Sequence, residues 1–140
     1  MQRILVAIDD SDCAQRAAAM AADLASRLGS MVTLAYAVPP PPALGEPAMV
    51  DVAALDRAHS EHGQQLLERT ARAVLRPGLR IEMQVLHGPP PEAINSAAEK
   101  LNADLLVVGS RGRNALTRAI LGSVCHALVQ TSKRPVLVVH

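Results

Sequence analysis

The chain has 140 residues, of which 49% are hydrophobic and 19% are charged, and its formal net charge is +1. These values predict a single compact cytoplasmic domain, residues 1–140, that is large enough to bury its own core. Tyr36 is the only aromatic residue, which argues against single-stranded nucleic-acid binding through stacked bases. No segment approaches the ~20 apolar residues of a membrane span. We therefore expect neither a nucleic-acid partner nor a membrane partner.

Short apolar runs along the chain predict β-strands, at residues 4–8, 31–38, 79–86, 105–108 and 136–139. The first, fourth and fifth runs are almost continuously apolar, as expected for parallel strands that are covered on both faces. The third run alternates apolar and polar residues, which indicates a half-exposed strand at a sheet edge.

Helical patterns occupy the segments between these strands. Apolar residues at helical spacing predict a first helix with Ser11 as its N-cap and Gly29 at its end. A second helix is expected over about residues 48–75, and a third has Pro91 available in its first turn. A fourth is expected to begin at Ser123 and to end near residue 132, with the Ser123 hydroxyl available to cap the helix, to bind phosphate or to alternate between the two. This alternation predicts a doubly wound α/β fold, an open parallel sheet with helices on both faces.

Two proline runs, residues 39–42 and 89–91, are interpreted as rigid linkers. The first opens a loop that extends to about residue 47. Cys13 and Cys125 form no recognisable metal pattern, and reduced thiols are expected for both.

The segment from residue 105 to the C-terminus predicts a phosphate-binding site. Gly109 and Gly112 follow the fourth strand, and Gly122 directly precedes Ser123 at the start of the fourth helix. Glycines allow a backbone to approach an anion closely, and a helix N-terminus presents free N–H groups. The segment has no Asp or Glu, and its positive charges come from Arg111, Arg113, Arg118, Lys133 and Arg134.

Asp9 is the candidate partner of this glycine segment. In an open α/β sheet, ligands bind beyond the carboxyl ends of the strands where the winding direction reverses. The loops after the first and fourth strands would meet there. A carboxylate at Asp9 can accept hydrogen bonds from a ribose or a base, whereas Asp10 and Ser11 are interpreted as helix-capping residues.

Several catalytic templates are absent from the sequence. We find no P-loop, no G-x-G-x-x-G turn after the first strand, no G-x-S-x-G elbow and no H-E-x-x-H pair. His59 and His62 are interpreted as part of a solvated helix face, because no third metal ligand is evident. His126 follows Cys125 directly, and adjacent helix residues point in different directions, so a catalytic pair is not expected.

The glycine pattern G-x2-G-x9-G-[ST] resembles that of the universal stress protein family. So do the opening ILVAIDDS, the segment LHGPPPEAI and the closing RPVLVV, so that the resemblance covers essentially the whole chain. It implies an adenine nucleotide alpha hydrolase-like fold with a five-stranded parallel sheet in the order 3-2-1-4-5. It also implies binding of ATP, or of AMP, ADP or cyclic AMP, with or without Mg²⁺.

The resemblance further implies a role for each matching position. The nucleoside would be contacted by Asp9, with Ala7 and Ile8 lining the adenine pocket and Ala37 bordering the base. Val108 and Gly109 would approach the ribose and base. The phosphates would be surrounded by Gly112, Arg113, Gly122, Ser123 and Val124. Arg111 stands where many relatives carry His, and its role stays open between phosphate binding and exposure to solvent.

The last strand, Val136–Val139, is expected at a sheet edge. An apolar, uncharged edge strand invites aggregation unless it is paired, and the resemblance implies a two-fold homodimer through it. The leading function is an ATP-binding stress-response protein whose nucleotide state modulates its conformation or its partner binding. Two alternatives stay open: a slow ATPase, autophosphorylating or nucleotidyl-transfer enzyme, and a nucleotide-independent interaction module. The scarcity of acids near the glycines weighs against catalysis, because phosphoryl transfer needs a base and usually a metal-holding carboxylate.

Overall fold

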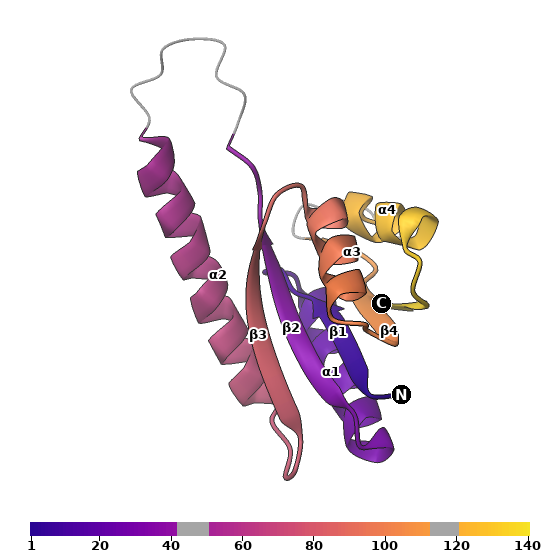
Figure 1. Ribbon diagram of the computed structural model, residues 1–140. Coiled ribbons are helices and arrows are strands. Elements are labelled where there is room, and N and C mark those ends of the chain that lie inside the picture. Colours follow the sequence, from indigo (N-terminus) through magenta and orange to yellow (C-terminus); the bar gives the residue numbers. More distant parts are fainter. Residues whose placement is uncertain (42–50, 113–120) are drawn as a thin grey trace.

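A computed structural model describes residues 1–41, 51–112 and 121–140, which form a parallel sheet with helices on both faces (Figure 1). The strand order is β3-β2-β1-β4-β5, which confirms the predicted doubly wound fold. In chain order the elements are β1 (Arg3–Ala7), α1 (Asp12–Leu28), β2 (Met31–Val38), α2 (Val52–Val74), β3 (Arg80–His87), α3 (Pro90–Lys100), β4 (Leu105–Gly109), α4 (Ser123–Thr131) and β5 (Val136–Val139).

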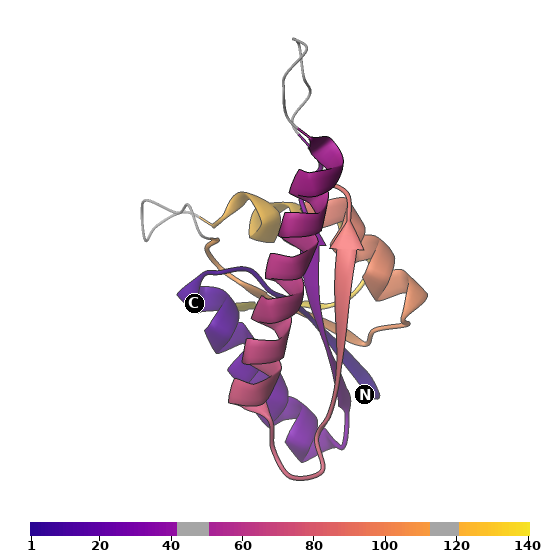
Figure 2. The ribbon, with the colours of Figure 1, turned by 90° about the vertical axis from the view of Figure 1, so that its left-hand side faces the viewer.

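The sheet separates two hydrophobic layers. Helices α1 and α2 cover one face and α3 and α4 cover the other, as the two perpendicular views show (Figures 1 and 2). Strand β1 explains why the central runs are continuously apolar: Ile4 and Val6 pack toward α1 and α2, whereas Leu5 and Ala7 pack toward α3 and α4. Because alternate residues of a strand point to opposite faces, a strand covered on both sides needs apolar residues throughout.

The helix ends agree with the sequence analysis at α1 and differ from it at α4. The Ser11 hydroxyl accepts a hydrogen bond from the Ala14 N–H at 3.1 Å, and Gly29 ends α1 with a left-handed φ of 67°. Of the roles considered for Ser123, the capping role was wrong: Gly122 is the N-cap, with extended backbone, and Ser123 is the first helical residue. The Gly122 N–H donates to the Ser110 carbonyl at 2.7 Å, which holds Gly122 outside the helix.

The second helix begins at Val52, with an Asp51 cap that accepts from the Ala54 N–H. Residues 48–50 of the range expected for it lie outside the described residues. Strand β3 forms one edge of the sheet and β5 the other, as expected. In the three described stretches of chain, no helix combines the length and the apolar character needed to cross a membrane.

Asp104 anchors the N-terminal end of the chain to the start of β4. Its carboxylate accepts hydrogen bonds from the backbone N–H groups of Gln2, at 2.6 Å, and Arg3, at 2.9 Å. Hydrogen bonds to the charged form, first from Arg3 and then from Gln2, lower the pKa of the Asp104 carboxyl below its ordinary value. The Asp104 N–H in turn donates to the Arg3 carbonyl, so the two segments are joined in both directions.

Candidate functional site

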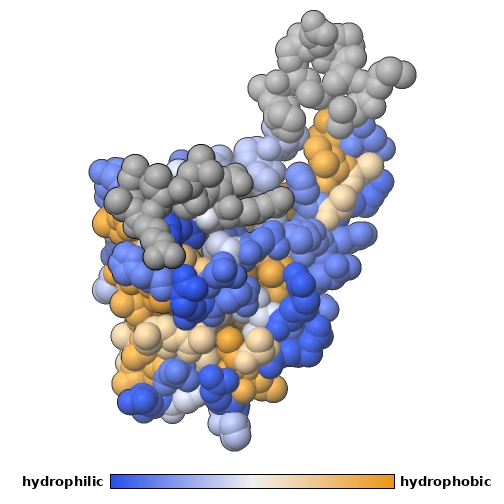
Figure 3. Space-filling model, turned by 180° about the vertical axis from the view of Figure 1, so that it is seen from behind, coloured by the Kyte–Doolittle hydropathy of each residue, from blue (hydrophilic) through white to orange (hydrophobic). Residues whose placement is uncertain are grey.

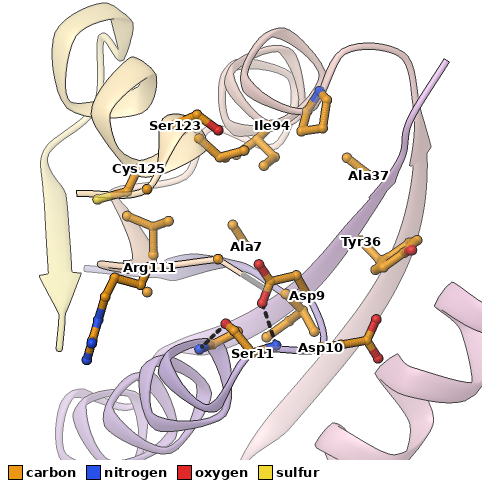
Figure 4. Close-up of a pocket in the computed structure, with 18 of the residues that line it drawn as sticks. Ala7, Asp9, Asp10, Ser11, Tyr36, Ala37, Ile94, Arg111, Ser123 and Cys125 are labelled. Atoms are coloured by element: carbon orange, nitrogen blue, oxygen red, sulfur yellow. Dashed lines mark hydrogen bonds between the residues drawn. The ribbon is translucent and has the colours of Figure 1, made fainter. Parts of the chain in front are cut away.

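A cavity of about 570 Å³ lies at the carboxyl ends of the central strands, within the usual ~300–1,000 Å³ range of small-molecule sites. It is bounded by the residues that follow β1, β2 and β4 and by the first turns of α3 and α4 (Figure 4). The chain leaves β1 toward α1 on one face of the sheet and leaves β4 toward α4 on the other. The cavity therefore sits where the winding direction reverses, the place predicted from the sequence.

Most of the site residues expected from the sequence line this cavity together. They are Ala7, Ile8, Asp9, Ala37, Val108, Gly109, Arg111, Gly112, Gly122, Ser123 and Val124. Arg113 lies outside the described residues. The sequence analysis did not include the remaining lining residues as ligand contacts: Asp10, Ser11, Ala14, Tyr36, Pro39, Pro90, Ile94, Leu121 and Cys125.

Some of these unexpected lining residues could have been placed at the cavity from the sequence. Tyr36 directly precedes Ala37 near the end of β2, and Pro90 opens α3 at the same edge of the sheet. Because α3 begins where β3 ends, its first turn must lie near the carboxyl ends of parallel strands. The side chain of Ile94 could have been placed there one turn later, although nothing in its sequence neighbourhood shows that it faces the cavity.

The glycines bring three backbone segments unusually close together. A Cβ atom on Gly109 would lie 2.8 Å from the Cys13 carbonyl carbon and 2.9 Å from the Ala14 nitrogen, so β4 and the start of α1 are in direct backbone contact. A Cβ on Gly122 would lie 3.0 Å from the Gly112 nitrogen. Gly109 has no room for a side chain and Gly122 has a tight contact, and both let backbone groups line one end of the cavity.

Hydrogen bonds fix the glycine-containing loop at both sides. The Ser110 carbonyl accepts from the Gly122 N–H, and the Ser110 N–H donates to the Val139 carbonyl, both at 2.7 Å. The side chain of Ser110 is buried. The loop after β4 is thus tied to the start of α4 on one side and to the end of β5 on the other.

The start of α4 presents donors toward the cavity. In any α-helix the first-turn N–H groups lack intrahelical acceptors, and Gly122 has no side chain with which to cap them. Ser123, Val124 and Cys125, which form this first turn, all line the cavity. The free N–H groups and the helix dipole favour a negatively charged ligand at this end.

Asp9 lines the cavity directly beside the glycine loop (Figure 4). One carboxylate oxygen accepts a hydrogen bond from the Ser11 N–H at 2.8 Å. The other lies 3.2 Å from the position that a Cβ of Gly112 would take. The capping interpretation of Ser11 is confirmed, and Asp9 has an oxygen directed at the loop that the sequence analysis paired with it.

Arg111 contributes its backbone to the cavity, whereas its guanidinium lies on the side away from the cavity centre (Figure 4). That side carries the buried Cys13 thiol, to which Arg16 donates a hydrogen bond at 3.1 Å. Burial by itself raises the pKa of Cys13. Hydrogen bonds from the Ser110 hydroxyl and the Arg111 N–H, together with the charges of Arg16 and Arg111, outweigh it and lower the pKa below its ordinary value.

Cys125 and His62, the other side chains considered for chemistry, have different surroundings from Cys13. Cys125 is buried, and desolvation raises the pKa of its thiol, which keeps it neutral. Both cysteines are free. His62 belongs to an exposed stretch of α2, as expected, but it also pairs with Asp10 across 2.9 Å. Within residues 1–41, 51–112 and 121–140, no three His, Cys, Asp or Glu side chains are grouped so that they could hold a metal ion.

A doubly wound parallel sheet with a cavity at its switch point defines a class of α/β proteins that bind ligands between the first and fourth strands. The sequence model of the Universal stress protein family matches residues 1–140, and the chain belongs to this family.

Individual relatives and solved structures are similar to this chain over nearly its whole length. A universal stress protein of Thermus aquaticus is 38% identical over 138 residues, which cover 97% of this chain and 96% of the relative. The structure of the universal stress protein UspA from Lactobacillus plantarum superposes with a TM-score of 0.88 at 27% identity, covering 99% of this chain and 97% of that one. A universal stress protein crystallised in complex with cAMP has a TM-score of 0.69 at 28% identity, with 99% and 97% covered.

Proposed function

We propose that this protein binds an adenine nucleotide, with ATP as its ligand, and that nucleotide occupancy changes its conformation or its binding to a partner. The proposal rests on one observation: the two ends of the switch-point cavity differ in chemical character. Its α4 end has glycine backbone and free helix N–H groups, whereas its β1 and β2 end has the apolar side chains of Ala7, Ile8 and Ala37, with the carboxylate of Asp9 at its border. An adenine nucleotide has the same division, with a flat base at one end and phosphates at the other.

The base would lie at the apolar end of the cavity. Ala7 and Ala37 are small, and Ile94 of α3 packs over the same face of the sheet and closes this end. Val108 lies beside them at the end of β4. Asp9 would accept hydrogen bonds from the nucleoside, since one of its oxygens faces the cavity and acceptor oxygens suit ribose hydroxyls and an exocyclic amine.

The phosphates would lie against Gly112, Gly122 and the first turn of α4. The Ser123 hydroxyl is not used as a cap, so it is available as a donor to a phosphate oxygen. Arg113 would add a positive charge there. The cAMP complex of a relative at 28% identity supports an adenine nucleotide in this fold. Mg²⁺ would enter with ATP, held chiefly by the phosphates themselves.

The direct experiment is calorimetric titration of the protein with ATP, ADP, AMP and cyclic AMP, each with and without Mg²⁺. We expect ATP to bind, and the absence of heat and of any thermal stabilisation with all four nucleotides would refute the proposal. Release of ADP under single-turnover conditions would instead favour the enzymatic alternative.

Gly122→Val tests where the phosphates lie. A side chain at Gly122 would enter the phosphate position and also press on the Gly112 nitrogen, 3.0 Å from the added Cβ. We expect this variant to keep its fold, measured by circular dichroism, and to lose ATP binding. Ser96→Val places the same side chain at an exposed position of α3 and should bind ATP normally. Normal binding by Gly122→Val would show that the phosphates lie elsewhere.

We further propose a homodimer formed through β5, in the cytoplasm, where the two free thiols would stay reduced. Strand β5 is apolar, partly exposed and at the sheet edge. Hydrophobic surface gathers on the side of the molecule away from α2, the side of the β5 edge (Figure 3). Sedimentation equilibrium should give twice the chain mass, and Leu137→Lys should reduce it to one; a wild-type monomer would refute the dimer.

A further inference from the structure

Tyr36 is the only aromatic residue of the chain. Its ring packs against a glycine of α2, a position without a side chain. A Cβ on Gly63 would lie 2.3 Å from Cδ1 of the tyrosine ring and 2.7 Å from Cε1. Gly63 is buried in the middle of α2, where glycine is a poor helix former compared with alanine. The helix therefore carries an unfavourable residue at a position where a Cβ atom would overlap the ring.

His62 holds the same ring from a second direction. The two rings are arranged edge to face, with centroids 6.1 Å apart and an interplanar angle of 73°. The His62 Nε2 atom lies 2.9 Å and 3.1 Å from the two carboxylate oxygens of Asp10. Tyr36 and Asp10 both line the cavity, on its α2 side (Figure 4). A single exposed histidine thus contacts two cavity residues, one from β2 and one from the loop after β1.

We propose that Tyr36 contacts the ligand as the outer wall of the base end of the cavity, and that Gly63 and His62 are positioning residues that hold its ring there. The inference rests on the proposed nucleotide binding. It assigns a new role to α2, a helix that contributes no lining residue of its own among those described.

The position of the ring favours the base over the phosphates. Tyr36 precedes Ala37 on β2 and points to the opposite face of the sheet, so its ring borders the cavity at the end of β2 on the α2 side, whereas the donor-rich first turn of α4 lies at the other end. An aromatic face or edge stabilises a flat heterocycle through stacking and dispersion. Ordering a freely rotating ring on ligand binding costs conformational entropy. Because Gly63 and His62 already fix the ring, this cost is smaller and the affinity is higher.

A purely structural role is the competing explanation, because Tyr36 also packs against the hydrophobic layer between the sheet and α1 and α2. Tyrosine fluorescence separates the two explanations. Since the chain contains no tryptophan and one tyrosine, all of its tyrosine emission comes from this ring. A ligand that touches the ring must change that emission, whereas a ligand bound elsewhere in the cavity need not.

The experiment is an ATP titration of the intact protein, followed in parallel by calorimetry and by tyrosine emission, with free tyrosine amide as the correction for light absorbed by ATP. Tyr36→Leu removes the ring, Gly63→Ala displaces it, and His62→Ala removes its edge contact. We expect each to lower ATP affinity, by about tenfold for Tyr36→Leu, the loss expected for one base–aromatic contact. Tyr36→Phe keeps the ring and should bind like the wild type. His59→Ala is the matched control, one turn earlier on α2.

Each outcome has a definite meaning. If the wild type binds no nucleotide, the proposed function fails and this inference fails with it. If the wild type binds ATP without a change in tyrosine emission, and Tyr36→Leu binds equally well, only the role of Tyr36 is overturned. If Gly63→Ala does not fold, Tyr36→Leu and His62→Ala still decide the question. Equal weakening by His59→Ala would show a general effect of α2 and refute the positioning role.

Discussion

Replacing Gly109 with alanine should destabilise the fold strongly, although alanine is ordinarily acceptable in a strand. The added Cβ would lie 2.8 Å from the Cys13 carbonyl carbon and Cβ and 2.9 Å from the Ala14 nitrogen, whereas favourable carbon contacts lie at about 3.5–4.0 Å. Two of these three atoms belong to the backbone of α1, which cannot rotate away as a side chain can.

The cost follows from two opposing effects. Overpacking of a core costs about 1–3 kcal/mol, and we expect the upper part of that range because the backbone of α1 must shift. Alanine recovers about 0.5–1 kcal/mol relative to glycine within a strand. The free energy of unfolding should therefore fall by about 2 kcal/mol, a substantial part of the ~5–15 kcal/mol available to a typical domain.

Urea unfolding followed by far-ultraviolet circular dichroism measures this change. With a slope near 2 kcal/mol per molar, the midpoint should fall by about 1 M. Gly78→Ala is an informative comparison, since Gly78 has open space around it but a φ of +77°, so that its cost is conformational, about 1 kcal/mol. A Gly109→Ala midpoint equal to that of the wild type, or above that of Gly78→Ala, would refute the steric argument.

Three further predictions concern single side chains. Ser11→Ala removes the cap of α1 and should cost about 1 kcal/mol in urea unfolding; an unchanged midpoint would contradict the capping role. Because the pKa of Asp104 is lowered in the folded protein, its stabilising effect is present above the unfolded carboxyl pKa of about 4 and is lost as the pH falls through the lowered native value. Asp104→Asn should therefore be less stable than the wild type at pH 7, with the difference vanishing in strong acid; a difference that persists in acid would contradict this linkage. Iodoacetamide should modify Cys13 before Cys125 at neutral pH, because the pKa of Cys13 is lowered and that of Cys125 is raised; mass spectrometry of the labelled peptides gives the order, and the reverse order would contradict it.

Much of the architecture could be predicted because it depends on local pattern. The continuous apolar run of β1 requires cover on both faces, and this requirement, repeated at β4, leads to a doubly wound sheet. Gly109 and Gly112 could be assigned to the cavity because a strand end fixes where the following loop lies. The shared position of Asp9 and the glycine loop followed from the general rule that ligands bind where the winding direction of an open α/β sheet reverses. The strand order itself was implied only by the family resemblance, and it is confirmed.

The remaining features depend on contacts between distant segments. Ser123 carries the usual signature of a helix cap, but the cap lies one residue earlier, at Gly122, whose N–H donates to the Ser110 carbonyl in a contact that the sequence does not reveal. The packing of Tyr36 against Gly63 could not be predicted either, because a glycine within a helix does not indicate which distant side chain packs against it. The direction of the Arg111 guanidinium, away from the cavity centre, likewise has no signal in the local sequence.

Ser110 joins the cavity to the sheet edge through its two backbone bonds, one accepted from Gly122 and one donated to Val139. In the proposed dimer, the strand that Val139 ends is the subunit contact. If a bound nucleotide displaced Ser110, the movement would pass through this hydrogen bond directly to Val139 and the subunit contact, and no helix would need to move. Thermodynamic linkage requires such coupling to act equally in both directions. Nucleotide would then alter the dissociation constant of the dimer, and dilution to monomers would alter nucleotide affinity by the same factor.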